Sequence, residues 1–182
     1  SMSYTPPTLT VPVGPDDWST GPDDAPVTLV EYGDFECPHC GAMEPVVRSL
    51  REWAGNNLRF VFRHFPLTAS HLHAELAAEA AEAAGAQGAF WPMHDTLLAN
   101  QQALTEHDLI QYATELGLDV GAFTTALEHH LYQPKVQADF MSGVRSGVGG
   151  TPTFYINGTR YDGDYDEESL RKAIQKATRL AR

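Results

Sequence analysis

Apolar residues gather in two short runs in the first third of the chain, and each run predicts a strand. Val27 to Tyr32 is a continuous β-branched and apolar stretch, and Leu58 to Arg63 alternates between apolar and polar positions. Between them, apolar residues recur at helical spacing from Met43 to Trp53. The order strand, helix, strand predicts the start of an α/β unit.

The middle of the chain has a different pattern, with helix-forming residues almost throughout and no strand signal. Capping residues followed by early acids mark several helix starts. We therefore predict a helical subdomain over residues 70–146, inserted between two halves of a sheet. Its expected helices are Ser70–Ala84, Phe90–Ala99, Thr105–Gly117, Asp119–His129 and Pro134–Arg145.

Strand signals return near the C-terminus. The dipeptide Asn157-Gly158 stands between Thr153–Ile156 and Thr159–Tyr161 and predicts a hairpin with a type I′ turn, because both residues tolerate positive φ. An amphipathic helix is expected from Asp166 to Leu180. The predicted organisation is a lead-in over residues 1–26, with an edge strand at Leu9–Val13, and a sheet domain formed by residues 27–69 and 147–182.

Charge restricts the classes of partner. The 182 residues include 24 acidic and 12 basic side chains, a formal net charge of -12. Such a surface repels nucleic acid and anionic lipid, so we expect neither as a partner. No stretch is long and apolar enough to predict membrane insertion. If Met2 is the native start, the sequence predicts a cytoplasmic protein; the alternative is an exported protein whose signal peptide has been removed.

The only two cysteines, Cys37 and Cys40, stand three residues apart where the first helix is expected to begin. Pro38 suits the first helical position because its missing amide hydrogen would have no partner there. Side chains three apart on a helix lie about 5–6 Å from each other at Cβ, close to what a disulfide needs. The positive end of the helix stabilises a thiolate, and His39 adds a donor or a charge. The pattern predicts a redox-active disulfide and no other cofactor.

Other interpretations of these residues remain open. A zinc site needs four ligands, and the chain has no second cysteine pair. A static disulfide across so short a loop adds little stability. Glu31, within the first strand, either reaches solvent at a sheet edge or is a buried acid that exchanges protons with Cys40. His71 and His73 are expected to be solvated helix residues.

Together, Glu31, the Cys37-Pro38-His39-Cys40 motif, the helical insertion and Gly150-Thr151-Pro152-Thr153 resemble the DsbA-like branch of the thioredoxin-fold superfamily. The resemblance implies an α/β thioredoxin fold with a mixed sheet and an inserted helical subdomain. It implies a thiol:disulfide oxidoreductase in which Cys37 is the nucleophile and Cys40 the buried resolving thiol. It also implies a cis peptide bond before Pro152 and a Thr151 backbone that binds an extended substrate strand.

The resemblance is not complete at the residue before the proline. Thr151 replaces the valine of the periplasmic oxidase that names the family and matches the threonine of related isomerases. Because this residue affects partner choice, we do not expect a quinone-linked membrane oxidase as the redox partner, and the sequence identifies no other. The resemblance implies protein thiols and disulfides as substrates. The lead-in is too short for a dimerisation domain, so a monomer is expected. The alternative function is a non-catalytic thioredoxin-fold module that binds peptides or a metal.

Overall fold

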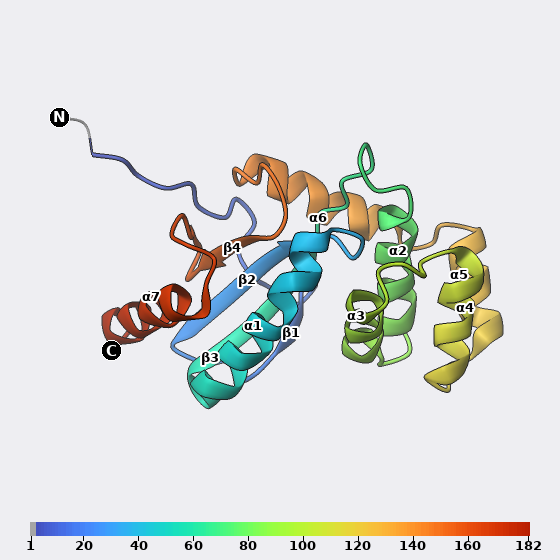
Figure 1. Cartoon of the computed structure of the whole chain (residues 1–182), viewed down its shortest axis with the longest axis horizontal. Helices are drawn as coiled ribbons and strands as arrows, with labels where there is room; N and C mark the ends of the chain where they lie inside the picture. Colours follow the sequence, from blue (N-terminus) through green and yellow to red (C-terminus); the bar gives the residue numbers. More distant parts are fainter. Residues whose placement is uncertain (1–2) are drawn as a thin grey trace. The chain divides into compact units, whose positions relative to one another are not determined.

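The computed structural model describes residues 3–182, which form five strands and seven α-helices (Figure 1). The strands lie in one sheet in the order β1, β3, β2, β4, β5. Three neighbouring pairs are antiparallel: β1 with β3, β2 with β4, and β4 with β5. The strand bounds are Trp18–Thr20 (β1), Val27–Gly33 (β2), Leu58–His64 (β3), Thr153–Ile156 (β4) and Thr159–Arg160 (β5).

The chain folds as two compact units. The first, which we call the sheet unit, contains the described residues up to Tyr32 together with Ala42–Arg63 and Met141–Arg182. The second, the helical unit, contains Gly33–Gly41 and His64–Phe140. The helical unit thus includes most of the predicted insertion and also the segment that carries both cysteines.

Helix α1, Pro38–Ala54, joins β2 to the short 3-10 helix Gly55–Asn57 that precedes β3. Its apolar positions follow helical spacing, so one stripe of the helix is buried; this stripe consists of Met43, Val47, Leu50 and Ala54. The last helix of the sheet unit, α7, spans Glu167–Leu180 and starts at Asp166, whose carboxylate accepts a hydrogen bond from the Ser169 amide at 2.8 Å. Both helices confirm the predicted amphipathic segments.

The predicted hairpin between β4 and β5 is confirmed. Asn157 has φ of 47° and Gly158 has φ of 85°, the two positive values that a type I′ turn requires. The Asn157 side chain also accepts a hydrogen bond from the Thr28 amide at 2.8 Å and donates one to the Pro26 carbonyl at 3.1 Å. The turn is therefore fastened to the start of the central strand.

The predicted lead-in strand at Leu9–Val13 is wrong. The segment contacts the sheet through a single antiparallel bridge between Thr8 and Thr159, supported by hydrogen bonds from Leu9 N to Gly158 O and from Arg160 N to Pro7 O, both at 2.9 Å. Prolines in this segment lack the amide hydrogens that would extend the pairing. The first strand of the sheet is instead β1, further along the chain.

A buried arginine holds the lead-in against the sheet. Arg63, only 2% exposed, donates to the two carboxylate oxygens of Asp17 at 2.8 and 3.0 Å. It also donates to the Tyr32 hydroxyl at 2.9 Å and to the Pro12 carbonyl at 3.2 Å. The two parallel bonds to one carboxylate are the geometry for which guanidinium is suited. The lead-in is thus part of the sheet unit.

The helical unit is built around α2, which packs against α3, α4 and α5 (Figure 1). Alanines fill most of α2, and ten of its twelve residues are buried, so neighbouring helices approach it closely. Caps predicted from the sequence are present: Thr105 and Asp108 form a capping box, and Asp119 accepts from the Ala122 amide. The helix bounds are Ala74–Gly85 (α2), Phe90–Ala99 (α3), Glu106–Glu115 (α4), Val120–Glu128 (α5) and Gln133–Arg145 (α6).

Candidate active site

The cysteine motif lies where the sequence predicts it, at the first turn of α1. Pro38 is the first residue of the helix, and the Cys37 carbonyl accepts the first helical hydrogen bond, from the Gly41 amide at 3.2 Å. Cys37 therefore stands at the positive end of the helix, where backbone amides favour an anion. Pro38 and His39 are exposed on the first turn.

The two sulfurs differ in their access to solvent. Cys37 is 7% exposed and Cys40 is 1% exposed. The Asp34 amide donates to the Cys40 sulfur at 3.4 Å, and the Cys37 amide donates to the Asp34 carbonyl at 3.1 Å. Backbone groups of one residue thus contact both cysteines.

The side chain of Asp34 fixes the loop that precedes the cysteines. Asp34 is 2% exposed, and its carboxylate accepts hydrogen bonds from the Glu36 amide at 2.8 Å and the Leu67 amide at 2.9 Å. A third bond, at 2.7 Å, joins it to Nδ1 of His71. A buried carboxylate requires several donors of this kind, and here they come from two chain segments more than 30 residues apart.

The expectation that His71 and His73 are solvated helix residues is wrong. Helix α2 begins at Ala74 rather than Ser70, and both histidines precede it. Nδ1 of His73 lies 2.8 Å from Oε2 of Glu36, and the His73 amide donates to Oε1 at 2.8 Å. These carboxylate bonds hold the segment out of the helix. The hydrogen bond to Asp34 raises the pKa of His71, while burial lowers it by less.

A glutamine from the turn after α3 contacts the cysteine motif. Nε2 of Gln101 donates to the Phe35 carbonyl at 3.0 Å and to the Cys37 carbonyl at 2.7 Å. The side chain lies against Gly41, where an added Cβ would stand 2.3 Å from Gln101 Oε1. The sequence carried no signal for Asp34, His71 or Gln101, because their partners are distant along the chain and the contacts are tertiary.

Glu31 lies in the sheet unit, on β2, opposite Phe154 of β4. It is 1% exposed, and β2 is the central strand. The alternative in which Glu31 reaches solvent at a sheet edge is therefore wrong. The other alternative, a buried acid that exchanges protons with Cys40, stays a prediction.

The loop before β4 contains the predicted cis peptide bond, between Thr151 and Pro152. Both residues are buried, and the Thr153 hydroxyl donates to the Gly150 carbonyl at 2.6 Å. Pro38, His39 and the two cysteines thus belong to the helical unit, whereas Glu31, Thr151 and Pro152 belong to the sheet unit.

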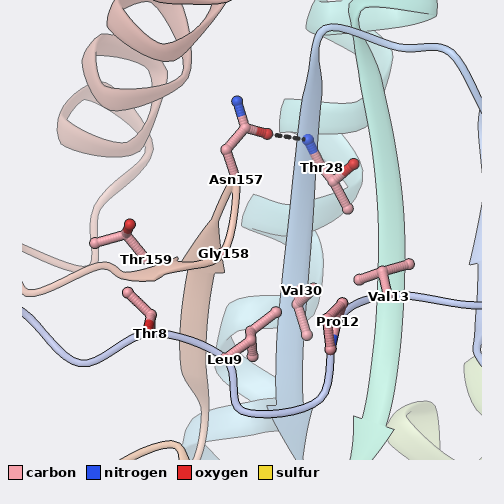
Figure 2. Close-up of a pocket in the computed structure, with 9 residues that line it drawn as sticks. All are labelled: Thr8, Leu9, Pro12, Val13, Thr28, Val30, Asn157, Gly158 and Thr159. Carbon is pink, nitrogen blue, oxygen red and sulfur yellow. Dashed lines mark hydrogen bonds between the residues drawn. The ribbon is translucent and has the colours of Figure 1, made fainter.

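The sheet unit also contains a cavity of about 400 Å³, whose lining includes none of the predicted site residues. Figure 2 shows its lining, which comes from the lead-in, from β2 and from the hairpin turn. The lining includes Leu9, Val13 and Val30 with the amide of Asn157, and none of its described residues carries a thiol, imidazole or carboxylate. Its side chains therefore offer no group for acid–base or nucleophilic chemistry.

Comparison with known proteins places this geometry in a family. A family model described as thioredoxin matches residues 14–176. A relative named as a Na(+)/H(+) antiporter, NhaA 1 of Salinispora arenicola, is 51% identical over 170 residues, which cover 93% of this chain and 26% of the relative. The chain spans about a quarter of the length of the curated relatives that it matches. Within residues 3–182, no helix has both the length and the apolar character needed to cross a bilayer.

Solved structures share the fold. A thioredoxin-like oxidoreductase from Silicibacter pomeroyi is 27% identical with a TM-score of 0.77, over 91% of this chain and 94% of that one. The alpha-DsbA1 protein of Wolbachia pipientis is 20% identical with a TM-score of 0.80, over 95% and 96% of the two chains. The mixed sheet with an inserted helical subdomain is therefore confirmed as DsbA-like, and the chain belongs to the thioredoxin family that its residues 14–176 match.

Proposed function

We propose that this protein is a thiol:disulfide oxidoreductase that forms or exchanges disulfides in protein substrates. The observation that carries the proposal is the position of Cys37 and Cys40 at the first turn of α1, one more exposed than the other. The 27% identity to a thioredoxin-like oxidoreductase supports the same class of activity.

In the oxidising direction, a substrate thiolate attacks the Cys37 sulfur of the Cys37–Cys40 disulfide. A mixed disulfide between substrate and Cys37 forms, and Cys40 leaves as a thiolate. A second substrate thiolate then attacks the substrate sulfur of the mixed disulfide, so the substrate gains a disulfide and Cys37 leaves as a thiolate. The substrate loses two electrons and the protein gains them; a redox partner of unidentified nature removes them again. Reduction of substrates follows the same steps in reverse.

We propose a role for the other predicted site residues as well. The helix N-terminus stabilises the leaving Cys37 thiolate, and exposed His39 adds a donor on the approach side. Glu31 is proposed to accept and return the Cys40 proton, and the Thr151-Pro152 loop to bind an extended substrate strand through main-chain hydrogen bonds. A catalyst of this kind needs no cofactor beyond its own disulfide.

Two cysteine variants test the proposal. Cys37→Ser is expected to abolish turnover of a disulfide-containing protein substrate, because the attacking sulfur is lost. Cys40→Ser is expected to accumulate the mixed disulfide with Cys37, visible as a mass shift that reducing agent reverses. Intact turnover in Cys37→Ser, or equal loss in both variants with no trapped species, contradicts these roles.

The competing function, a module that binds peptides or a metal without catalysis, predicts a different outcome. Its Cys37 would have an ordinary thiol pKa near 8.5, and the wild-type protein would not exchange disulfides. A metal at the two thiols would need further ligands. Among the described residues of the helical unit, no other histidine, cysteine or carboxylate forms a ligand cluster with them. Dithiol exchange is therefore the function that the site supports best.

A further inference from the structure

The Asp34 carboxylate creates an electrostatic problem for the reaction. It is a buried acid three residues before Cys37, and its own backbone contacts both cysteines. A negative charge near a thiol disfavours the thiolate, which is the form that the exchange reaction needs. The helix N-terminus alone would have to overcome this repulsion.

His71 supplies the opposite charge at the same carboxylate. Its Nδ1 lies 2.7 Å from Oδ2 of Asp34, and its side chain is 19% exposed, so the pair is largely shielded from solvent. The hydrogen bond to Asp34 raises the pKa of His71 most, and the charges of Asp34, of Cys37 as a thiolate and of Glu36 raise it further, against a lowering by burial. Electrostatic coupling is reciprocal, so an imidazolium that is stabilised by the Cys37 thiolate also stabilises that thiolate.

We propose that His71 is a positioning residue that neutralises Asp34, holds the loop before the cysteines, and thereby stabilises the Cys37 thiolate. The inference rests on the proposed dithiol function and adds to it a residue that adjusts the oxidising strength of the disulfide. Because the thiolate belongs to the reduced form, His71 makes the Cys37–Cys40 disulfide a stronger oxidant.

The chain contains a matched control two residues away. His73 forms the same kind of bond to Glu36, at 2.8 Å against 2.7 Å for the His71 pair, but the His73 side chain is 38% exposed and that of Glu36 is 18% exposed. Solvent screens this second pair more strongly. Loss of the His73 charge should therefore affect Cys37 much less than loss of the His71 charge.

The test replaces each histidine by asparagine, whose amide can donate where Nδ1 stood but carries no charge. The rate of Cys37 alkylation is measured against pH, and the dithiol–disulfide equilibrium is measured against glutathione. In His71→Asn the midpoint of the alkylation profile should rise by about one pH unit, a typical effect of removing one nearby charge. The equilibrium constant against glutathione should shift about tenfold toward the disulfide, which corresponds to a reduction potential about 30 mV lower. His73→Asn should change either quantity less than about twofold, a limit set by the weakness of exposed pairs.

A double variant separates charge from structure. Asp34→Asn combined with His71→Asn removes both charges and should return the alkylation profile close to that of the wild type. If His71→Asn leaves the profile unchanged, or if the double variant is shifted as far as His71→Asn, the proposal is wrong. Should the double variant not fold, as judged by circular dichroism, the comparison of His71→Asn with His73→Asn still decides.

The alkylation profile needs no substrate, so the inference and the proposed function can fail separately. If the wild type does not exchange disulfides but His71→Asn shifts the Cys37 profile, the proposed function is wrong and the role of His71 stands. If the wild type is active and the profile does not move, only the role of His71 is wrong.

Discussion

Substitution of Gly41 by alanine should destabilise the protein, although it adds a good helix former to α1. Alanine in a helix interior is favoured over glycine by about 1 kcal/mol. The new Cβ, however, would stand 2.3 Å from Oε1 and 2.8 Å from Cδ of Gln101. The flexible side chain can move away, but it then loses its hydrogen bonds to the Phe35 and Cys37 carbonyls, each worth about 0.5–1.5 kcal/mol. The net cost should be about 0–2 kcal/mol.

In a Gln101→Ala background, the expected effect of Gly41→Ala on stability changes sign. The three nearest neighbours of the added Cβ all belong to Gln101, so Gln101→Ala clears the space. In that background Gly41→Ala should stabilise the protein by up to about 1 kcal/mol, the bare helix preference. Urea unfolding of the reduced protein gives all four free energies, and the coupling between the sites should be about 1–3 kcal/mol, the value of the two lost bonds. Stabilisation by about 1 kcal/mol in both backgrounds would refute the assignment of Gln101.

Two further predictions concern buried charges. Arg63→Met leaves the Asp17 carboxylate, whose side chain is 9% exposed, without its bidentate partner. The free energy of unfolding in urea should fall by about 3–5 kcal/mol. An unchanged urea midpoint would contradict the role of Arg63 in anchoring the lead-in. Burial raises the pKa of Glu79 above that of an unfolded glutamate, and the hydrogen bond to His130 lowers this pKa by a smaller amount. The protonated carboxyl therefore contributes stability at acid pH, and this stability is lost as pH rises through the folded pKa. The melting temperature of Glu79→Gln should therefore rise relative to that of the wild type as pH rises from about 4.5. A difference between the two melting temperatures that stays constant across pH would contradict this.

Local signals account for most of the architecture that the sequence predicts. Asn157-Gly158 can satisfy two positive φ values, so it predicts its turn without any tertiary information. Thr105, Asp119 and Asp166 cap helices through amides only three residues away, and Pro38 starts α1 for an equally local reason. Elements of this kind follow from neighbours along the chain.

The parts that the sequence does not predict depend on distant partners. His71 and His73 stand among helix formers, yet bonds to Asp34 and Glu36, 37 residues earlier, keep them outside α2. The same holds for Gln101, whose acceptors are backbone carbonyls that no sequence pattern marks. The cysteines could be predicted because their chemistry lies in their spacing, whereas the residues that surround them could not.

The attachment of the lead-in to the hairpin covers part of one edge of the sheet. β5 is the last strand of the sheet, and an uncovered strand edge offers unpaired amides and carbonyls to any extended peptide. The bridge from Thr8 to Thr159 and the two flanking hydrogen bonds occupy that edge. At the opposite end of the sheet, β1 is only three residues long. The described sheet therefore leaves little unpaired backbone at its two edges for a second extended chain to join.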